Sequence, residues 1–289
     1  MSKKAAKRRP TLEIPAYITA FSRLLEFISP HLAAAFAIKL FTTPLRYKLP
    51  KRKLEMDKKS RQKTIRIPKI NRDVMVYEYG KGNEKILLVQ GWSGRGTQLV
   101  KFADEFVKAG YSTISFDAPA HGKSEGKQTL MPEFIATILQ LEKEFGPFKA
   151  AVGHSLGGMS LLNAVRQGLK VNRMVIIGSG DIIKDIVDDF VAKLKLKPGI
   201  GNLMTAHFEK TSGQTMAEYS AYVAAQHVGI PVLVVHDEKD QEVSINCAHH
   251  IVEHLKQGQL LVTKGLGHRK ILGNHDVINS TLKFLNIKL

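Results

Sequence analysis

The feature that most constrains the fold is an alternation of short apolar runs with stretches of helical spacing, which begins near residue 64. "KILLVQG" (85–91) is a nearly continuous apolar run that ends in glycine, as expected of a strand buried on both faces. The helical stretch "GTQLVKFADEFVKAG" follows, and this order recurs down to a last helical stretch, "VINSTLKFLNI". Repeated strand–helix units predict an α/β fold with a mostly parallel, doubly wound sheet covered by helices on both faces.

Two segments of this part of the chain depart from the alternation. "KTIRIPKI" and "DVMVYEYG" predict an antiparallel opening pair of strands. Residues 181–229 contain about three helical pieces and no clear strand pattern. Ligands of parallel sheets bind beyond the carboxyl ends of the strands, so a helical insertion at 181–229 would act as a cap over that edge. We therefore expect a basic extension with two short helices (1–63) and one α/β domain (64–289).

The positive charge is concentrated in the N-terminal quarter. Residues 1–70 hold 18 Lys and Arg against 4 Asp and Glu, whereas the remainder holds 25 against 22. Because the main domain is nearly balanced and carries no recognition motif, we do not expect nucleic acid as a partner. Prolines divide the apolar part of the extension into two helix-sized pieces, which charged residues interrupt, so neither is expected to span a membrane.

Two interpretations of the basic extension stay open. In the first, its helices pack on the α/β domain and its cations are solvated. In the second, an amphipathic basic segment makes peripheral contact with an anionic membrane surface. The single cysteine, Cys247, excludes an intrachain disulfide and suits a reducing compartment, so the expected location is cytoplasmic, or peripheral to the membrane in the second interpretation. No paired Cys/His ligand spacing occurs, and we expect no metal and no cofactor.

A serine at the end of one predicted strand is the candidate nucleophile. In "AAVGHSLGGMS" (150–160), Gly153, Ser155 and Gly157 satisfy G-x-S-x-G, with a strand pattern before the motif and a helix pattern after it. Such a serine lies on a strained strand-to-helix turn that has no room for side chains beside it. The next backbone N–H, that of Leu156, then points toward a developing oxyanion near the helix N-terminus. The alternative is that Ser155 is only a tight-turn serine.

A serine hydroxyl is a weak nucleophile and needs a base that an acid orients. His268, in "GLGHRKIL", lies between the last predicted strand and the last helix and is the candidate base, unless it is a surface or capping histidine. Asp240, in "VVHDEKDQEV", is the candidate acid, and Asp181, after "RMVIIGSG", is its rival. The chain order Ser155, Asp240, His268 matches the order of nucleophile, acid and base in one known fold.

The second oxyanion donor is expected from the loop after "KILLVQG". There the backbone N–H of Trp92 is in position, although its indole could instead line the pocket. His121 and His154 lie close to these motifs in the sequence and are interpreted as structural residues.

Taken in order, the serine motif, "FDAPAHGKSEG", "VVHDEKDQEV" and "GLGHRKIL" make the chain resemble the α/β-hydrolase superfamily from about residue 70 to the C-terminus. With "GWSGRGTQL", it is similar to bacterial α/β-fold serine hydrolases that carry a GHSLGG elbow and have no defined substrate. Two departures stand out. Gln90 precedes Gly91 where the family usually has histidine, which we expect to alter hydrogen bonding near the oxyanion loop. Ala120 and His121 precede Gly122 where D-x-x-G-x-G is common, which we expect to alter loop packing.

A serine nucleophile favours acyl transfer to water through an acyl-enzyme. We therefore expect a carboxylesterase-like enzyme that hydrolyses a small-molecule carboxylic ester or thioester. The alternatives are a membrane-surface lipid or acyl-chain hydrolase, an acyltransferase with an acceptor other than water, and a non-catalytic binding module on the same fold.

Overall fold

The structure is a computed structural model that describes residues 14–47 and 54–288. The cationic tail at the N-terminus and the basic residues 48–53, on which the membrane interpretation partly rests, lie outside the described residues. The strands are β1 (Arg61–Ile67), β2 (Arg72–Tyr79), β3 (Lys85–Val89), β4 (Ser112–Phe116), β5 (Phe148–His154), β6 (Arg173–Ile177), β7 (Val232–Asp237) and β8 (Gly258–Thr263). The α-helices are α1 (Ala16–Ile28), α2 (Pro30–Thr42), α3 (Leu54–Lys59), α4 (Val100–Lys108), α5 (Met131–Phe145), α6 (Leu156–Arg166), α7 (Ile183–Lys193), α8 (Gly199–Ser212), α9 (Ala221–Ala225), α10 (Ile245–His254), α11 (Gly267–Lys270) and α12 (His275–Phe284). Short 3₁₀ helices are η2 (Pro68–Ile70), η3 (Met216–Tyr219) and η4 (Ile271–Gly273).

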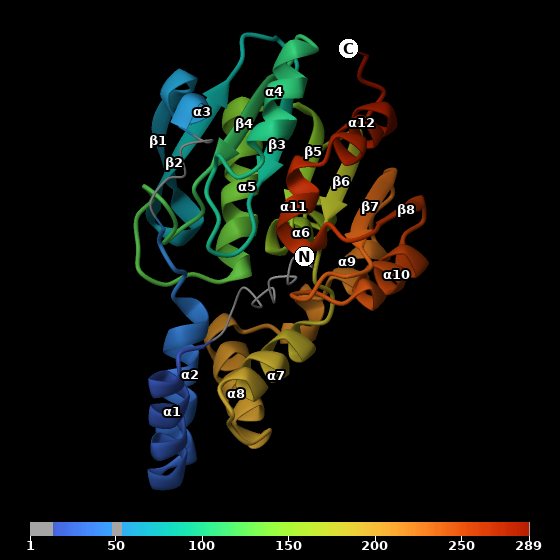
Figure 1. Ribbon diagram of the computed structural model, residues 1–289. Helices are drawn as coiled ribbons and strands as arrows, with labels where there is room; N and C mark the ends of the chain where they lie inside the picture. Colours follow the sequence, from blue (N-terminus) through green and yellow to red (C-terminus); the bar gives the residue numbers. More distant parts are fainter. Residues whose placement is uncertain (1–13, 48–53, 289) are drawn as a thin grey trace, which may run out of the picture.

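An eight-stranded sheet forms the centre of the molecule, in the order β1-β2-β4-β3-β5-β6-β7-β8 (Figure 1). The β1–β2 and β2–β4 pairs are antiparallel, and the remaining pairs are parallel. The predicted α/β fold with a mostly parallel, doubly wound sheet is therefore confirmed. The antiparallel opening pair is found where it was expected, with Ile67 opposite Arg72 next to the turn.

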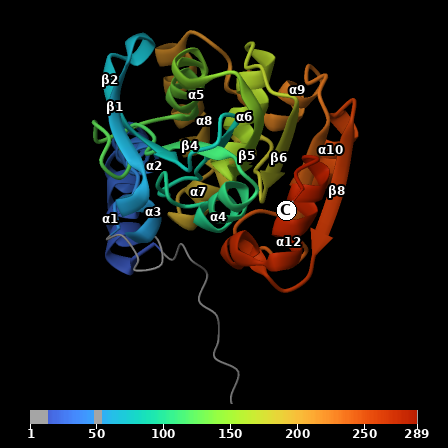
Figure 2. The same cartoon turned by 90° about the horizontal axis from the view of Figure 1, so that it is seen from above.

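Helices cover both faces of the sheet, which explains why the central strands are nearly continuous apolar runs. Figure 2 shows α4 and α12 on one side of the sheet and α5 and α6 on the other. Phe102 and Phe106 of α4 are fully buried in the core of the first side, and Phe134 of α5 and Leu161 of α6 in the core of the second. Strands β3, β5, β6, β7 and β8 run parallel, so the loops that follow them lie at the same end of the sheet.

The segment between β6 and β7 folds as α7, α8, η3 and α9, within the range predicted to be a helical insertion. Helices α7 and α8 lie next to the α1–α2 hairpin, below the sheet in Figure 1. Phe41 of α2 packs edge-on against Phe190 of α7, with ring centroids 5.2 Å apart, and its ring lies 5.8 Å from that of Phe208 in α8. Helix α2 therefore shares an apolar core with α7 and α8. None of the described helices combines the length and the apolar content that crossing a bilayer requires.

Candidate active site

Ser155 occupies the turn between β5 and α6 with φ 53° and ψ −122°, a combination that residues with a side chain seldom adopt. Its backbone N–H donates to the carbonyl of Ile177 at the end of β6, at 2.9 Å. A Cβ at Gly153 would lie 2.7 Å from the carbonyl oxygen of Gly157, and one at Gly157 would lie 2.5 Å from that of Val89. The two motif glycines are therefore required by close packing, and this packing holds the strained turn in place.

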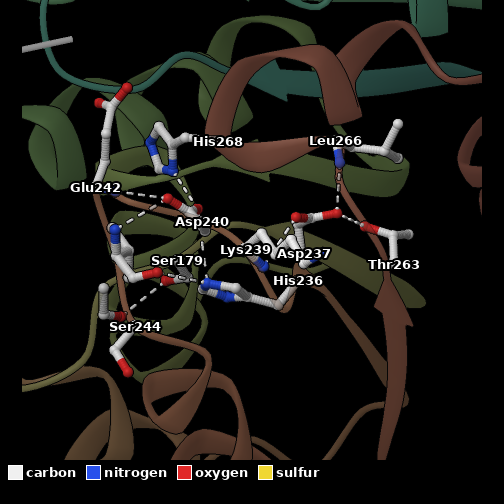
Figure 3. Close-up of polar contacts among 12 residues, drawn as sticks. Ser179, His236, Asp237, Lys239, Asp240, Glu242, Ser244, Thr263, Leu266 and His268 are labelled. Atoms are coloured by element: carbon white, nitrogen blue, oxygen red, sulfur yellow. Dashed lines mark hydrogen bonds and ion pairs between the residues drawn. The ribbon is translucent and has the colours of Figure 1, made fainter. Parts of the chain in front are cut away.

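Asp240 and His268 come from different loops and meet at the carboxyl edge of the sheet (Figure 3). Asp240 Oδ2 lies 2.7 Å from His268 Nδ1, and Asp240 Oδ1 accepts the backbone N–H groups of Glu242 and Val243 at 2.8 and 3.1 Å. Burial by itself would raise the pKa of Asp240, but hydrogen bonds from His268 and the two amides outweigh it and hold the pKa below its ordinary value. The carboxylate is ionised at neutral pH, so His268 Nδ1 carries the proton and Nε2 is the basic nitrogen.

Asp237, which also belongs to the motif of the candidate acid, fixes the loop that carries His268. Its carboxylate accepts the N–H of Lys239 at 3.0 Å, the hydroxyl of Thr263 at 2.8 Å and the N–H of Leu266 at 2.8 Å (Figure 3). Burial would raise the pKa of Asp237, but these and further backbone hydrogen bonds lower it overall. Asp237 thus joins the end of β7 to the connection between β8 and α11, and positions His268 from a distance.

Contacts around Gly178 bring the turn of Ser155 and the Asp240–His268 pair together. Gly178 directly follows Ile177, whose carbonyl accepts the N–H of Ser155. A Cβ at Gly178 would lie 3.2 Å from His268 Nδ1 and 3.6 Å from Asp240 Oδ2. The three predicted residues therefore surround one stretch of backbone at the end of β6. The sequence motifs do not single out Gly178, because its role depends only on what packs against it.

His154, the residue before the serine, packs beside His268. The two ring centroids are 4.6 Å apart, and His154 Nε2 lies 3.0 Å from the carbonyl oxygen of His268. Burial, followed by the neighbouring His268, lowers the pKa of His154 to about 3. The ring is therefore neutral and donates from Nε2, and it adds no positive charge beside the candidate base.

The loop after β3 is held over Ser155 by two side chains that sequence reasoning did not assign to the site. Gln98 Oε1 accepts the N–H of Gly91 at 2.7 Å, and His121 Nε2 accepts the N–H of Ser93 at 3.0 Å. Burial lowers the pKa of His121 to about 4, so the ring is neutral and can act as this acceptor. The unusual histidine before Gly122 is the one sequence signal that could have pointed to this contact.

Of the two expected oxyanion donors, Trp92 lies in the loop after β3 and Leu156 directly follows Ser155. A Cβ at Gly91 would lie 3.0 Å from Ser155 Cβ, so the loop that carries Trp92 passes directly over the serine. The indole of Trp92 packs edge-on against His121, with ring centroids 5.3 Å apart. Within residues 14–47 and 54–288, nothing accepts a hydrogen bond from the backbone N–H of Trp92 or Leu156. Gln90 stands where the family usually has histidine. It is buried, and no described residue forms a hydrogen bond with its side-chain amide.

Asp181, the rival acid, is directed away from His268. Its Oδ2 hydrogen-bonds His250 Nδ1 in α10, and its Oδ1 accepts the N–H of Tyr222 in α9 at 2.9 Å. The structure thus brings Asp240 to His268 and gives Asp181 a role in joining α9 to α10. Cys247, also in α10, is half-buried, and burial raises the pKa of its thiol to about 11, which disfavours the reactive thiolate.

Comparison with known proteins agrees with this architecture. The sequence profile of a family described as alpha/beta hydrolase fold matches residues 85–210, which include the serine turn. The chain has the fold of the α/β hydrolases. This agrees with the superfamily resemblance drawn from the sequence. A search among curated protein sequences found no match.

Solved structures resemble this α/β-hydrolase-fold protein along most of its length. An esterase from Pyrococcus furiosus superposes with a TM-score of 0.65 at 16% identity, covering 85% of this chain and 97% of its own. An esterase from Exiguobacterium antarcticum gives 0.63 at 15%, covering 78% of this chain and 100% of its own. A bacterial membrane phospholipase A gives 0.63 at 13%, covering 93% of this chain and 96% of its own. At these identities the similarity establishes the shared fold.

Proposed function

We propose that the protein is a serine hydrolase that cleaves a small-molecule carboxylic ester or thioester through an acyl-enzyme. The observation that carries this proposal is the buried Asp240–His268 hydrogen bond beside a serine held in a strained turn. Nucleophile, base and acid are the three roles that acyl transfer to water needs, and these residues follow β5, β8 and β7 at the same end of the sheet.

In the proposed reaction, Ser155 Oγ attacks the acyl carbonyl carbon while its proton passes to His268 Nε2. Asp240, ionised and bonded to Nδ1–H, stabilises the imidazolium that forms. The carbonyl oxygen becomes an oxyanion and accepts the N–H groups of Trp92 and Leu156. Collapse of this intermediate breaks the bond to the alcohol or thiol, which leaves with the proton from His268. Water, activated by the same histidine, then hydrolyses the acyl-enzyme.

The two amides matter because they are aimed at the charge that appears only as the reaction proceeds. Gln98 and His121 hold the loop of Trp92 in place before substrate binds, so little reorganisation is needed. Loss of one such donor typically lowers the rate by about 10²–10³, which corresponds to about 3–4 kcal/mol.

The choice of acyl group is assigned to the helical segment 181–229, which we propose acts as a cap. The esterases and the phospholipase A among the structural neighbours act, by their names, on esters, which supports this substrate class for the present protein. A short-chain preference on a panel of p-nitrophenyl esters from acetate to palmitate would indicate a closed cap, and a long-chain preference an open one.

Labelling by a fluorophosphonate probe tests the proposal directly. The wild-type protein should be labelled and should hydrolyse p-nitrophenyl esters, whereas Ser155→Ala should do neither. Ser280→Ala is the matched control and should behave as wild type. Ser280 lies in α12, on the face of the sheet that α4 also covers. Absence of labelling in the wild type would favour the non-catalytic hypothesis, and equal labelling of Ser155→Ala would show that the probe reacts with a residue other than Ser155.

A further inference from the structure

Helix α1 exposes its apolar side to solvent. Four large apolar residues spaced i, i+4, i+7 and i+11 lie on one side of the helix, a stripe about 17 Å long at 1.5 Å per residue. These residues are Tyr17, Phe21, Leu24 and Ile28, with exposed fractions of 74, 47, 54 and 63%. Phe27, beside the stripe, is 91% exposed. Together these five residues form what we call the outer face of α1.

The side of α1 that packs inward combines small polar residues with Ile18 and Leu25, which are partly buried against the core. Thr19 and Ser22 are buried, and their hydroxyls donate to the helix carbonyls of Ala16 and Ile18 at 2.9 and 2.8 Å. A surface helix ordinarily places its apolar stripe toward the core and its polar residues toward water. Helix α1 differs in that it also carries large apolar residues on the side that faces water, so its outer face loses the hydrophobic gain of burial as long as it stays in water.

The hairpin of α1 and α2 projects from the body of the molecule, and its turn lies at the far end (Figure 1). Phe27 and Ile28 are at this turn, and Leu32, 50% exposed, follows on α2. The exposed apolar residues therefore continue around the turn at one end of the molecule, a position from which they can enter a lipid surface.

Cations accompany this apolar surface. An open groove of about 470 Å³ lies between α1 and the connection from α7 to α8. Its lining includes Arg23, Leu24, Glu26, Phe27 and Lys197. Within the described parts of the chain, no carboxylate forms an ion pair with Arg23 or Lys197. Glu26, the single acidic residue between positions 14 and 47, accepts the backbone N–H of Lys197 at 2.8 Å. The groove thus offers two cationic side chains beside two exposed apolar ones.

We propose that the outer face of α1 docks on an anionic phospholipid bilayer. The apolar side chains would enter the boundary between headgroups and acyl chains, and Arg23 and Lys197 would bind phosphate groups. A second copy of the chain is a poor occupant, because a two-fold interface would set the cations of one hairpin against those of the other. Basic residues precede and follow the hairpin in the sequence, and their positive charge also favours binding to an anionic surface.

The hairpin is fastened to the catalytic edge, which sets the orientation of the docked molecule. Beyond α2, the N–H of Leu45 donates to Ser93 Oγ at 3.0 Å, in the loop that carries Trp92. Arg46 donates to the carbonyls of Ala120, Ser124 and Gly126 at 3.0, 3.0 and 2.9 Å. Docking would therefore hold the loop of the candidate oxyanion site at a fixed orientation relative to the membrane. The docking itself requires no catalysis and does not rest on the proposed function.

Sedimentation with extruded vesicles tests this inference on the full-length chain. Vesicles of equimolar phosphatidylglycerol and phosphatidylcholine should bind the wild type, and Phe27→Glu should lower its partition coefficient by about tenfold or more, since burial of one aromatic side chain is lost. Val262→Glu is the matched control: Val262 is 41% exposed on β8, at the opposite edge of the sheet, and its substitution adds the same charge. It should bind as the wild type does.

A second pair of measurements examines the cations. Arg23→Gln combined with Lys197→Gln should weaken binding to the anionic vesicles by roughly tenfold or more, and should leave the weaker binding to pure phosphatidylcholine unchanged. No sedimentation of the wild type, or equal loss in Phe27→Glu and Val262→Glu, would overturn the proposal. So would a wild-type dimer, measured by light scattering, that Phe27→Glu dissociates and that binds no vesicles. None of these readouts depends on Ser155, so a failure here is distinguishable from a failure of the hydrolase proposal.

Discussion

Replacing Asp240 by asparagine is the sharpest test of the site, because the substitution keeps the shape of the side chain and removes its charge. Oδ1 could still accept the N–H groups of Glu242 and Val243, so the loop should keep its conformation. The amide nitrogen would face His268 Nδ1 and donate to it. The imidazole would then carry its proton on Nε2, where it cannot accept one from Ser155.

The magnitude follows from the observed geometry. The lost contact is a buried, charge-assisted hydrogen bond of 2.7 Å. A carboxylate and a developing imidazolium whose charges lie about 4 Å apart attract each other by about 4 kcal/mol at an effective dielectric constant near 20. Each 1.36 kcal/mol is tenfold in rate, so this interaction alone accounts for about 10³, and the wrong tautomer adds to the loss. We expect kcat to fall by about 10³–10⁴ with little change in KM.

Asp181→Asn is the matched control, since it makes the same chemical change in the rival acid. It removes the charge that faces His250 and leaves His268 untouched, so hydrolysis of p-nitrophenyl butyrate should stay within a few-fold of wild type. Circular dichroism and thermal unfolding of both variants would separate loss of activity from loss of fold. An Asp240→Asn variant that keeps a tenth or more of the wild-type kcat, or an Asp181→Asn variant that loses as much, would refute the assignment of the acid.

Two further predictions concern the surroundings of the site. Gly178→Ala places a Cβ 3.2 Å from His268 Nδ1 at φ +58°, and should lower kcat by about 10–100-fold through displacement of the imidazole; Gly110→Ala, also at positive φ but with nothing within 4 Å, should cost about 1 kcal/mol of stability and leave kcat unchanged. Because burial lowers the pKa of His121 from 6.5 to about 4, the unfolded chain binds an extra proton between these values, so His121 should by itself lower stability by about 3 kcal/mol as the pH drops from 6.5 to 4. Burial of His154 acts in the same direction, so His121→Gln should reduce this pH dependence in urea unfolding without abolishing it, and an unchanged slope would contradict the contribution assigned to His121.

The sequence by itself determined the architecture and the position of the candidate nucleophile. Apolar runs of strand length between helical stretches allow little besides a parallel sheet covered on both faces, and the structure has that sheet. The serine motif is equally local, because Gly153 and Gly157 flank Ser155 within five residues. Glycine at these two positions indicates that the turn has no room for a side chain beside Ser155. Patterns of this kind can be predicted because their physical cause lies between neighbouring residues.

The tertiary structure decided what depends on residues far apart in the chain. Asp181 and Asp240 both follow strands, and no local pattern distinguishes them; only the packing of α10 gives the first to His250 and leaves the second to His268. His121 acts on a loop 28 positions before it, and the role of Gly178 exists only because the imidazole of His268 lies against it. The same holds for α1, for which the sequence left two interpretations open. Its contacts with the rest of the protein bury Thr19 and Ser22 and leave Tyr17 and Leu24 exposed, because burial is set by which surfaces meet and not by the order of residues along one helix.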